Sequence, residues 1–280
     1  MISPPKYRVL FLGNSHVAAL YQGWLEIAPE FKGINPSFFA ANSSLFNSLE
    51  MSENRVFGVH DPKLYSRKNL RFLDQVFGER RIDLKMFDQI VVVGRSSHEV
   101  DFLSQFERFS IDGVGDGETG RDGPKGNVPY LSQAAFDAFC IEIAHKRLPD
   151  PCWWNWTAPK VAFLPPPVPR ADCPETDDRY GAWARFGANP GNDLAFLKLY
   201  RAHVARLYAN HGITLLSPPD EVYDPCGLTR AEFGDDPERL HPRAGAFDSD
   251  DFHHMNTRYG VIVLRDILQT LQTSGQGAAP

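Results

Sequence analysis

YRVLFLGNSHVAALYQGWLEIA, residues 7–28, is the stretch that decides the fold. Its first part, Tyr7–Leu12, is a short apolar run of the kind found in strands that are buried on both faces. The part that follows, from Ser15 to Ala28, repeats apolar side chains at helical spacing. A strand that turns directly into a helix is the opening unit of an α/β fold.

The same alternation of apolar runs and helical patterns recurs along the chain. Further strands are expected at Pro36–Ala40, Asp88–Val93, Val161–Leu164 and Ile213–Leu216. Further helices are expected at Asn69–Phe77, Ser132–Arg147, Asn192–Asn210 and Thr257–Thr273, the last with Asn256 as its N-cap. This order predicts a three-layer α/β/α domain over residues 1–280, with a central, mostly parallel, five-stranded sheet. Long loop insertions are expected around residues 112–130, 165–192 and 218–250, and such loops often shape a site.

Composition excludes several classes of function. The formal net charge of −6 over 280 residues disfavours nucleic acid as a partner, because phosphate binding needs clustered Lys and Arg. No run approaches the roughly 20 apolar residues that a membrane span needs. The first residues lack the charged start and apolar middle of a signal peptide, so we expect a cytoplasmic protein.

Metal and cofactor sites are not expected. The four cysteines form no Cys-x-x-Cys pair. Histidines and acidic residues gather between His241 and His254, but their spacing matches no standard metal site. The sequence therefore predicts neither a bound metal nor a cofactor.

Ser15 is the first candidate for chemistry. At the junction of a strand and a helix, its hydroxyl lies at the edge of the sheet. Its backbone N–H lies at a helix N-terminus, where it can stabilise an oxyanion. The alternative is that Ser15 only caps the helix, since a serine hydroxyl is a poor nucleophile without a base.

Asp251 and His254 supply a candidate base near the other end of the chain. A carboxylate three residues before a histidine can accept from its Nδ1–H, which leaves Nε2 free to take a proton. Asp250 and His253 have the same spacing, so the residues alone leave two registers open. A solvated acidic loop with surface histidines is the alternative to both.

Together these residues resemble the SGNH hydrolases, also called GDSL-type esterases and lipases, and within them the branch that acts on carbohydrate acetyl esters. The first motif of that family, Gly-Asp-Ser, resembles Gly13–Ser15, with Asn14 in the place of Asp. The last motif, Asp-x-x-His followed often by Tyr-Gly, resembles Asp251–Asn256 with Tyr259-Gly260. The resemblance selects the register of Asp251 and His254.

The middle motifs depart from the family. Its third motif, Gly-x-Asn-Asp, corresponds to Gly94-Arg95-Ser96-Ser97, so Ser96 replaces the usual oxyanion donor. For Arg95 two positions stay open, one that adds a charge to the site and one that faces solvent. Its second motif supplies a glycine N–H, but residues 40–44 contain no glycine. We expect a backbone N–H of this turn to serve, with the Asn42 side chain as a substitute donor.

The resemblance implies a serine esterase that hydrolyses a small acyl ester, with acetyl and a sugar or polysaccharide as the expected parts of the substrate. Ser15 would attack, His254 would be the base and Asp251 would orient it. Asn14, Asn42, Gly94, Arg95 and Ser96 would form the oxyanion hole and substrate site. Two alternatives stay open: an acyltransferase in polysaccharide modification, and a catalytically silent glycan-binding protein.

Overall fold

The structure is a computed structural model. It describes residues 7–95, 99, 102–103, 110–111, 130–146, 148, 160–174, 180–187, 192–240 and 251–276. Ser96 and nearly all of the insertion expected around 112–130 lie outside the described residues. The descriptions below concern the described part of the chain.

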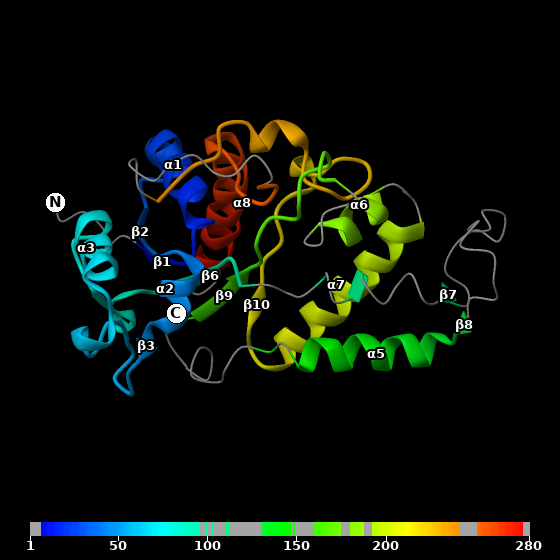
Figure 1. Ribbon diagram of the computed structural model, residues 1–280, viewed down its shortest axis with the longest axis horizontal. Coiled ribbons are helices and arrows are strands. Elements are labelled where there is room, and N and C mark those ends of the chain that lie inside the picture. The colour runs from blue at the N-terminus through cyan, green and yellow to red at the C-terminus, as the bar shows by residue number, and fades with distance from the viewer. Residues whose placement is uncertain are drawn as a thin grey trace.

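The centre of the molecule is a five-stranded sheet in the order β10-β9-β6-β1-β2, and all its strand pairs are parallel (Figure 1). Its strands are β1 (Tyr7–Gly13), β2 (Ile34–Ala40), β6 (Gln89–Val93), β9 (Lys160–Leu164) and β10 (Thr214–Leu215). Gly13 pairs in register with Ala40 on one side and with Val93 on the other. The carboxyl ends of these strands therefore lie along one edge, which is where open α/β sheets place their ligands.

Helices cover both faces of this sheet, which confirms the three-layer α/β/α fold expected from the sequence. The described helices are α1 (Val17–Ile27), α2 (Ser43–Ser48), α3 (Arg67–Val76), α5 (Gln133–His145), α6 (Gly181–Gly187), α7 (Asn192–Asn210) and α8 (Thr257–Gln276). Short 3₁₀ turns lie at Ala28–Glu30, Pro62–Leu64, Leu84–Met86, Asp220–Val222 and Ala231–Gly234. Among the described residues, no helix is long and apolar enough to cross a membrane.

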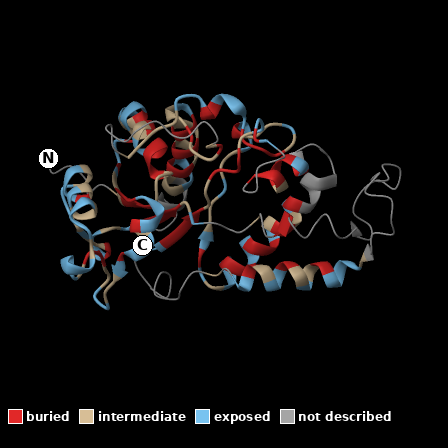
Figure 2. Cartoon of the chain, viewed as in Figure 1, coloured by how far each residue is buried: buried red, intermediate tan, exposed pale blue. Residues whose placement is uncertain are grey.

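The apolar run of β1 is explained by burial on both sides. Val9 and Phe11 belong to the core under α1 and α8, whereas Leu10 and Leu12 belong to the core shared with α3, α5 and α7. All four side chains are completely buried. Figure 2 shows that buried residues gather on the strands of the central sheet and on the faces of the helices that cover it. Each contributes roughly 1.5–3 kcal/mol on burial, so a polar residue at any of these positions would be costly.

Helices α1 and α8 cross at very close range, and Figure 1 shows them side by side over the sheet. Glycines make the approach possible: a Cβ added to Gly260 of α8 would collide with the carbonyl oxygen of Ala19 in α1. A Cβ added to Gly23 would in turn meet the backbone of Gly260. This contact joins the two ends of the chain and fixes the segments that precede both helices.

Two smaller sheets were not predicted from the sequence. One is antiparallel and contains β3 (Glu50–Met51), β4 (Val56–Gly58) and β5 (Arg81–Asp83). The other is a parallel pair of β7 (Ser110–Ile111) and β8 (Tyr130–Leu131). Strands of two or three residues are too short to show an alternating pattern, so periodicity could not find them.

Candidate active site

Ser15 lies in the turn between β1 and α1. It does not cap the helix through its side chain, because the N-cap position belongs to His16 and no side chain caps the helix there. The first bonds of the helix are made by main-chain atoms, including the Ala18 N–H to the Ser15 carbonyl at 3.0 Å. The Ser15 hydroxyl is therefore free of the capping role that was its alternative explanation.

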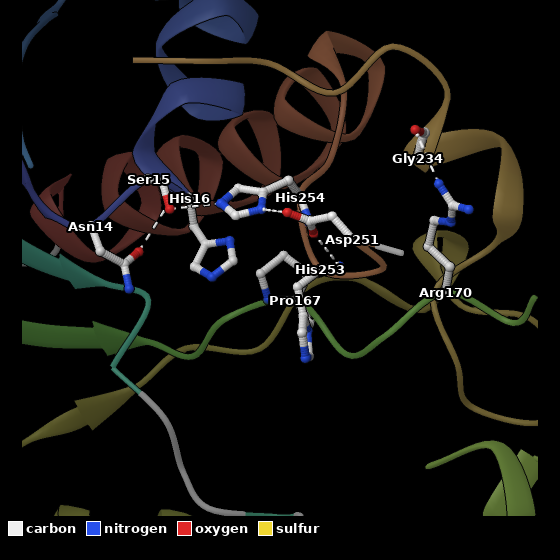
Figure 3. A network of polar contacts seen from close by, with 9 residues as sticks. All are labelled: Asn14, Ser15, His16, Pro167, Arg170, Gly234, Asp251, His253 and His254. Carbon is white, nitrogen blue, oxygen red and sulfur yellow. Dashed lines mark hydrogen bonds and ion pairs between the residues drawn. The ribbon is translucent and has the colours of Figure 1, made fainter. Parts of the chain in front are cut away.

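The hydroxyl instead contacts the segment before α8. Ser15 Oγ lies 2.7 Å from His254 Nε2, and His254 Nδ1 lies 2.6 Å from Asp251 Oδ2 (Figure 3). Since an ionised carboxylate can only accept, Nδ1 carries the proton and Nε2 accepts from the serine hydroxyl. Residues 239 positions apart thus form one continuous chain of hydrogen bonds.

Asp251 is held as a carboxylate. Its second oxygen, Oδ1, accepts from the backbone N–H groups of His253 and His254, each at 3.1 Å. Burial by itself raises the pKa of Asp251, but the hydrogen bond and charge of His254 and the two backbone amides outweigh it and lower the pKa well below its ordinary value. Asp251 is therefore ionised throughout the neutral range and can orient the imidazole.

The two neighbouring histidines have different partners. His254 contacts Ser15, whereas His253 Nδ1 lies 3.0 Å from the carbonyl oxygen of Pro167. The His253 ring also packs against Tyr180, with ring centroids 4.8 Å apart. The geometry thus separates the two registers that the spacing left open: Asp251 and His254 meet the serine, and His253 faces the loop after β9.

His16 is a site residue that the sequence analysis missed. Its ring stacks on that of His254, with centroids 5.0 Å apart and planes 24° apart. Its Nδ1 is buried and has no hydrogen-bond partner among the described residues, although the residue as a whole is partly exposed. Burial first, and then the charges of His254 and His253, lower the pKa of His16 well below its ordinary value. Its place directly after Ser15 was the one available signal.

Asn14 and Gly94 join the turn after β1 to the turn after β6. Asn14 Nδ2 donates to the Gly94 carbonyl at 3.0 Å, and Asn14 Oδ1 accepts from the His16 N–H at 3.2 Å. Gly94 has φ of +79°, and a Cβ there would collide with the Asn14 amide. The Gly94 N–H donates to the Leu164 carbonyl at 2.9 Å, so both of its backbone groups are already engaged.

Of the other expected site residues, Asn42 and Arg95 belong to the described part of the chain. Asn42 is exposed and caps α2, its Oδ1 accepting from the Leu45 N–H at 2.9 Å, which leaves its amide NH₂ at the surface. Arg95 is exposed, and Ser96 lies outside the described residues. Within the described ranges, no group of three or more His, Cys, Asp or Glu side chains could hold a metal ion.

Arg170, which was also not predicted from the sequence, holds the turn that carries Asp251 and His254. The Arg170 N–H donates to the Phe252 carbonyl at 3.0 Å, and the Arg170 guanidinium lies over the Phe252 ring at 5.0 Å. The guanidinium also donates to the Gly234 carbonyl at 3.1 Å (Figure 3). It pairs in addition with Asp172. Phe252 lies between Asp251 and His253, so these contacts fix the turn that carries the carboxylate.

The start of α8 completes this support. Asn256 Oδ1 accepts from the Tyr259 N–H at 3.2 Å, which confirms the N-cap expected from the sequence. The Asn256 amide also donates to the carbonyls of Glu232 and Asp235. His254 is therefore followed by a capped helix, and the turn before it is held by Arg170.

Comparisons with known proteins add little to this geometry. No protein-family profile and no curated protein sequence matches the chain. A solved structure that resembles it is the periplasmic domain of a lipopolysaccharide acetyltransferase from Salmonella ser. Paratyphi A, at 12% identity and a TM-score of 0.38, over 97% of this chain and 85% of that one. So distant a likeness carries nothing over to this chain, and membership of the SGNH hydrolases, like the cytoplasmic location, stays a prediction.

Proposed function

We propose that the protein is a serine esterase that hydrolyses small acyl esters. One observation carries the proposal: the unbroken hydrogen bonds from Ser15 through His254 to Asp251, at 2.7 and 2.6 Å. A serine becomes a nucleophile when a base takes its proton, and a base works when its tautomer is fixed. Both conditions are met here with no further movement of the three side chains.

In the proposed reaction, Ser15 Oγ attacks the ester carbonyl while His254 Nε2 takes its proton. His254 then gives that proton to the leaving alcohol, and an acyl-serine forms. A water molecule, deprotonated by His254, releases the acid and restores the serine. Asp251 stays ionised and stabilises the imidazolium in both steps.

The oxyanion would be held by main-chain and amide donors. The Ser15 N–H lies at the start of α1, where the helix dipole favours negative charge. We assign the second donor to the turn around Asn42, whose amide NH₂ is not used in capping α2. Gly94 would shape this part of the site through Asn14, because its own N–H is bonded to Leu164.

Labelling with a fluorophosphonate probe tests the nucleophile. The wild type should label, and Ser15→Ala should not. His254→Ala should label slowly and lose turnover of short-chain aryl esters by about 10⁴-fold or more, as expected when one member of a catalytic unit is removed. His253→Ala is the matched control and should retain labelling, because the His253 ring lies against the Pro167 carbonyl and the backbone N–H that holds Asp251 is kept. Equal labelling of wild type and Ser15→Ala would refute the proposal.

The same three residues would also serve an acyltransferase, in which a sugar hydroxyl replaces water in the second step. Adding an alcohol acceptor during ester turnover separates the two reactions, since a transferase forms the new ester in preference to free acid. A silent glycan-binding protein has no need of an oriented base. Absence of both labelling and turnover would favour that alternative.

A further inference from the structure

The proposed mechanism leaves the His16 ring without a role. This ring is stacked on the His254 ring, with centroids 5.0 Å apart and planes 24° apart. Both residues line the same small cavity as Ser15. Figure 3 shows the His16 ring beside that of His254, and its side chain takes no part in the hydrogen bonds drawn there. Its contact with the base is therefore made through the face of the ring.

The hydrogen bonds of His254 act on the edge of its ring. Nδ1 and Nε2 point outward in the ring plane, so Asp251 and Ser15 hold the imidazole along that plane, at 2.6 and 2.7 Å. One of these two bonds is lost during the reaction, because Ser15 Oγ has no proton to donate once it is acylated. In the acyl-enzyme the ring is then held at its edge by Asp251, while its face still lies against His16.

His16 is a rigid support for this contact. It is the N-cap residue of α1, and its backbone N–H donates to Asn14 Oδ1 at 3.2 Å. Helix α1 is itself packed against α8 where Gly23 meets Gly260, and the His16 Nδ1 atom is buried. A ring that its helix already fixes loses little further freedom when it stacks on another ring, so the contact can hold His254 in place.

The surroundings of His16 also keep it neutral while His254 is charged. Burial first, and then the charges of His254 and His253, lower the pKa of His16 well below its ordinary value. His254 becomes an imidazolium each time it takes a proton, and a second cation with its ring centre 5.0 Å away would repel it. A neutral ring lies against the imidazolium without this repulsion. The environment of His16 therefore favours support of the base over proton transfer by His16 itself.

We propose that His16 is a positioning residue, whose ring keeps the His254 imidazole in place for the attack of water after Ser15 has been acylated. The inference rests on the proposed esterase function and concerns its second step. In that step water loses a proton to His254 Nε2 and its oxygen bonds to the acyl carbon. The bond from that carbon to Ser15 Oγ then breaks, and the proton returns to Oγ. A displaced imidazole slows this step, because proton transfer requires hydrogen-bonding distance.

Stopped-flow kinetics with para-nitrophenyl acetate separate the two steps, since the good leaving group makes acylation fast. The initial burst of nitrophenolate measures acylation, and the steady rate that follows measures attack by water. In His16→Leu, which fills a similar volume without an aromatic ring, the steady rate should fall about five- to tenfold, the effect of one ring pair. The burst rate should change by less than about twofold, because Ser15 still donates to His254 before acylation.

His16→Phe is the matched variant, since it restores a flat ring that has no proton to exchange. Its steady rate should lie within about twofold of the wild type. The amplitude of the burst counts the folded active sites, so each rate is expressed per site and partial misfolding does not alter it.

Three results would overturn the role of His16 while leaving the esterase intact. These are equal slowing of both phases in His16→Leu, no slowing of either phase, and a steady rate in His16→Phe as low as in His16→Leu. A wild type that neither releases nitrophenolate nor labels with the fluorophosphonate probe would instead refute the proposed function, and the role of His16 with it.

Discussion

Two turns at the same edge of the sheet, one after β1 and one after β6, differ in what they carry. Gly13 and Val93 pair in register, so the turns begin side by side. The turn after β1 presents Ser15 and His16 to the segment before α8. The turn after β6 presents an exposed Arg95 and a glycine whose backbone groups are both engaged.

The difference shows that a position at the edge of the sheet does not by itself bring an imidazole to a turn. Both turns lie where ligands bind in α/β sheets. The first turn has a partner brought to it by helix packing, because α1 follows it directly and α8 lies against α1. The second turn is linked to the site through Asn14, and we expect its contribution to be structural support.

The largest expected effect comes from breaking the hydrogen bond between Ser15 and His254. Asp251→Asn places an NH₂ group against His254 Nδ1, which favours the tautomer with a proton on Nε2. That tautomer cannot accept from Ser15, so kcat should fall by about 10⁴-fold while the fold is kept. Steady-state kinetics on an aryl ester, with circular dichroism as the folding check, measures this. A loss below about tenfold would mean that Asp251 does not orient the base.

The next effect concerns the second oxyanion donor. The Gly94 N–H is already bonded, so this donor is assigned to Asn42. Asn42→Ser keeps a good N-cap for α2 but removes the amide NH₂. If Asn42 holds the oxyanion, kcat should fall by about 100-fold at nearly unchanged stability. Asn42→Asp, which also caps, should lose the same activity. Unchanged turnover in both variants would remove Asn42 from the oxyanion hole.

A smaller effect tests the link between the two turns. Asn14→Asp keeps the acceptor for the His16 N–H but sets a carboxylate oxygen against the Gly94 carbonyl. The free energy of unfolding should fall by about 1–3 kcal/mol, the cost of losing a partly buried donor. Asn42→Asp is the control and should change it by less than about 0.5 kcal/mol. Urea unfolding compares them, and a neutral Asn14→Asp would argue against the link.

The smallest effect is a pH dependence of stability from His16. Its pKa is lowered in the folded protein, so below about pH 6.5 the unfolded chain binds a proton that the folded one does not. Stability should therefore fall with decreasing pH, by up to about 1.4 kcal/mol per pH unit for this one group.

Asp251 does not interfere with that measurement. Its lowered pKa adds stability that is lost only as the pH falls below about 4, the range of an unfolded aspartate. Urea unfolding at pH 7, 6 and 5 should show a steeper loss in the wild type than in His16→Phe. Parallel curves would mean that His16 is not held neutral by the fold.

Much of the fold was predictable because its signals are local. The apolar run of Tyr7–Leu12 marks a strand buried on both faces, and Asn256 marks the start of the last helix. The short strands of the antiparallel sheet, such as Val56–Gly58, have no periodic signal and were missed. His16 and Arg170 were missed because their roles come from contacts with residues far along the chain.

By itself, the sequence determined the order of the five central strands and of the main helices around them, and it placed a serine and two Asp-x-x-His registers at the ends of elements. Local spacing could not choose between His253 and His254, since the two are equivalent along the chain. The tertiary structure decided, because the close crossing of α1 and α8 at Gly23 and Gly260 brings one imidazole to Ser15 and turns the other toward Pro167. Contacts between residues far apart in the sequence depend on how the helices pack, and local spacing does not determine that packing.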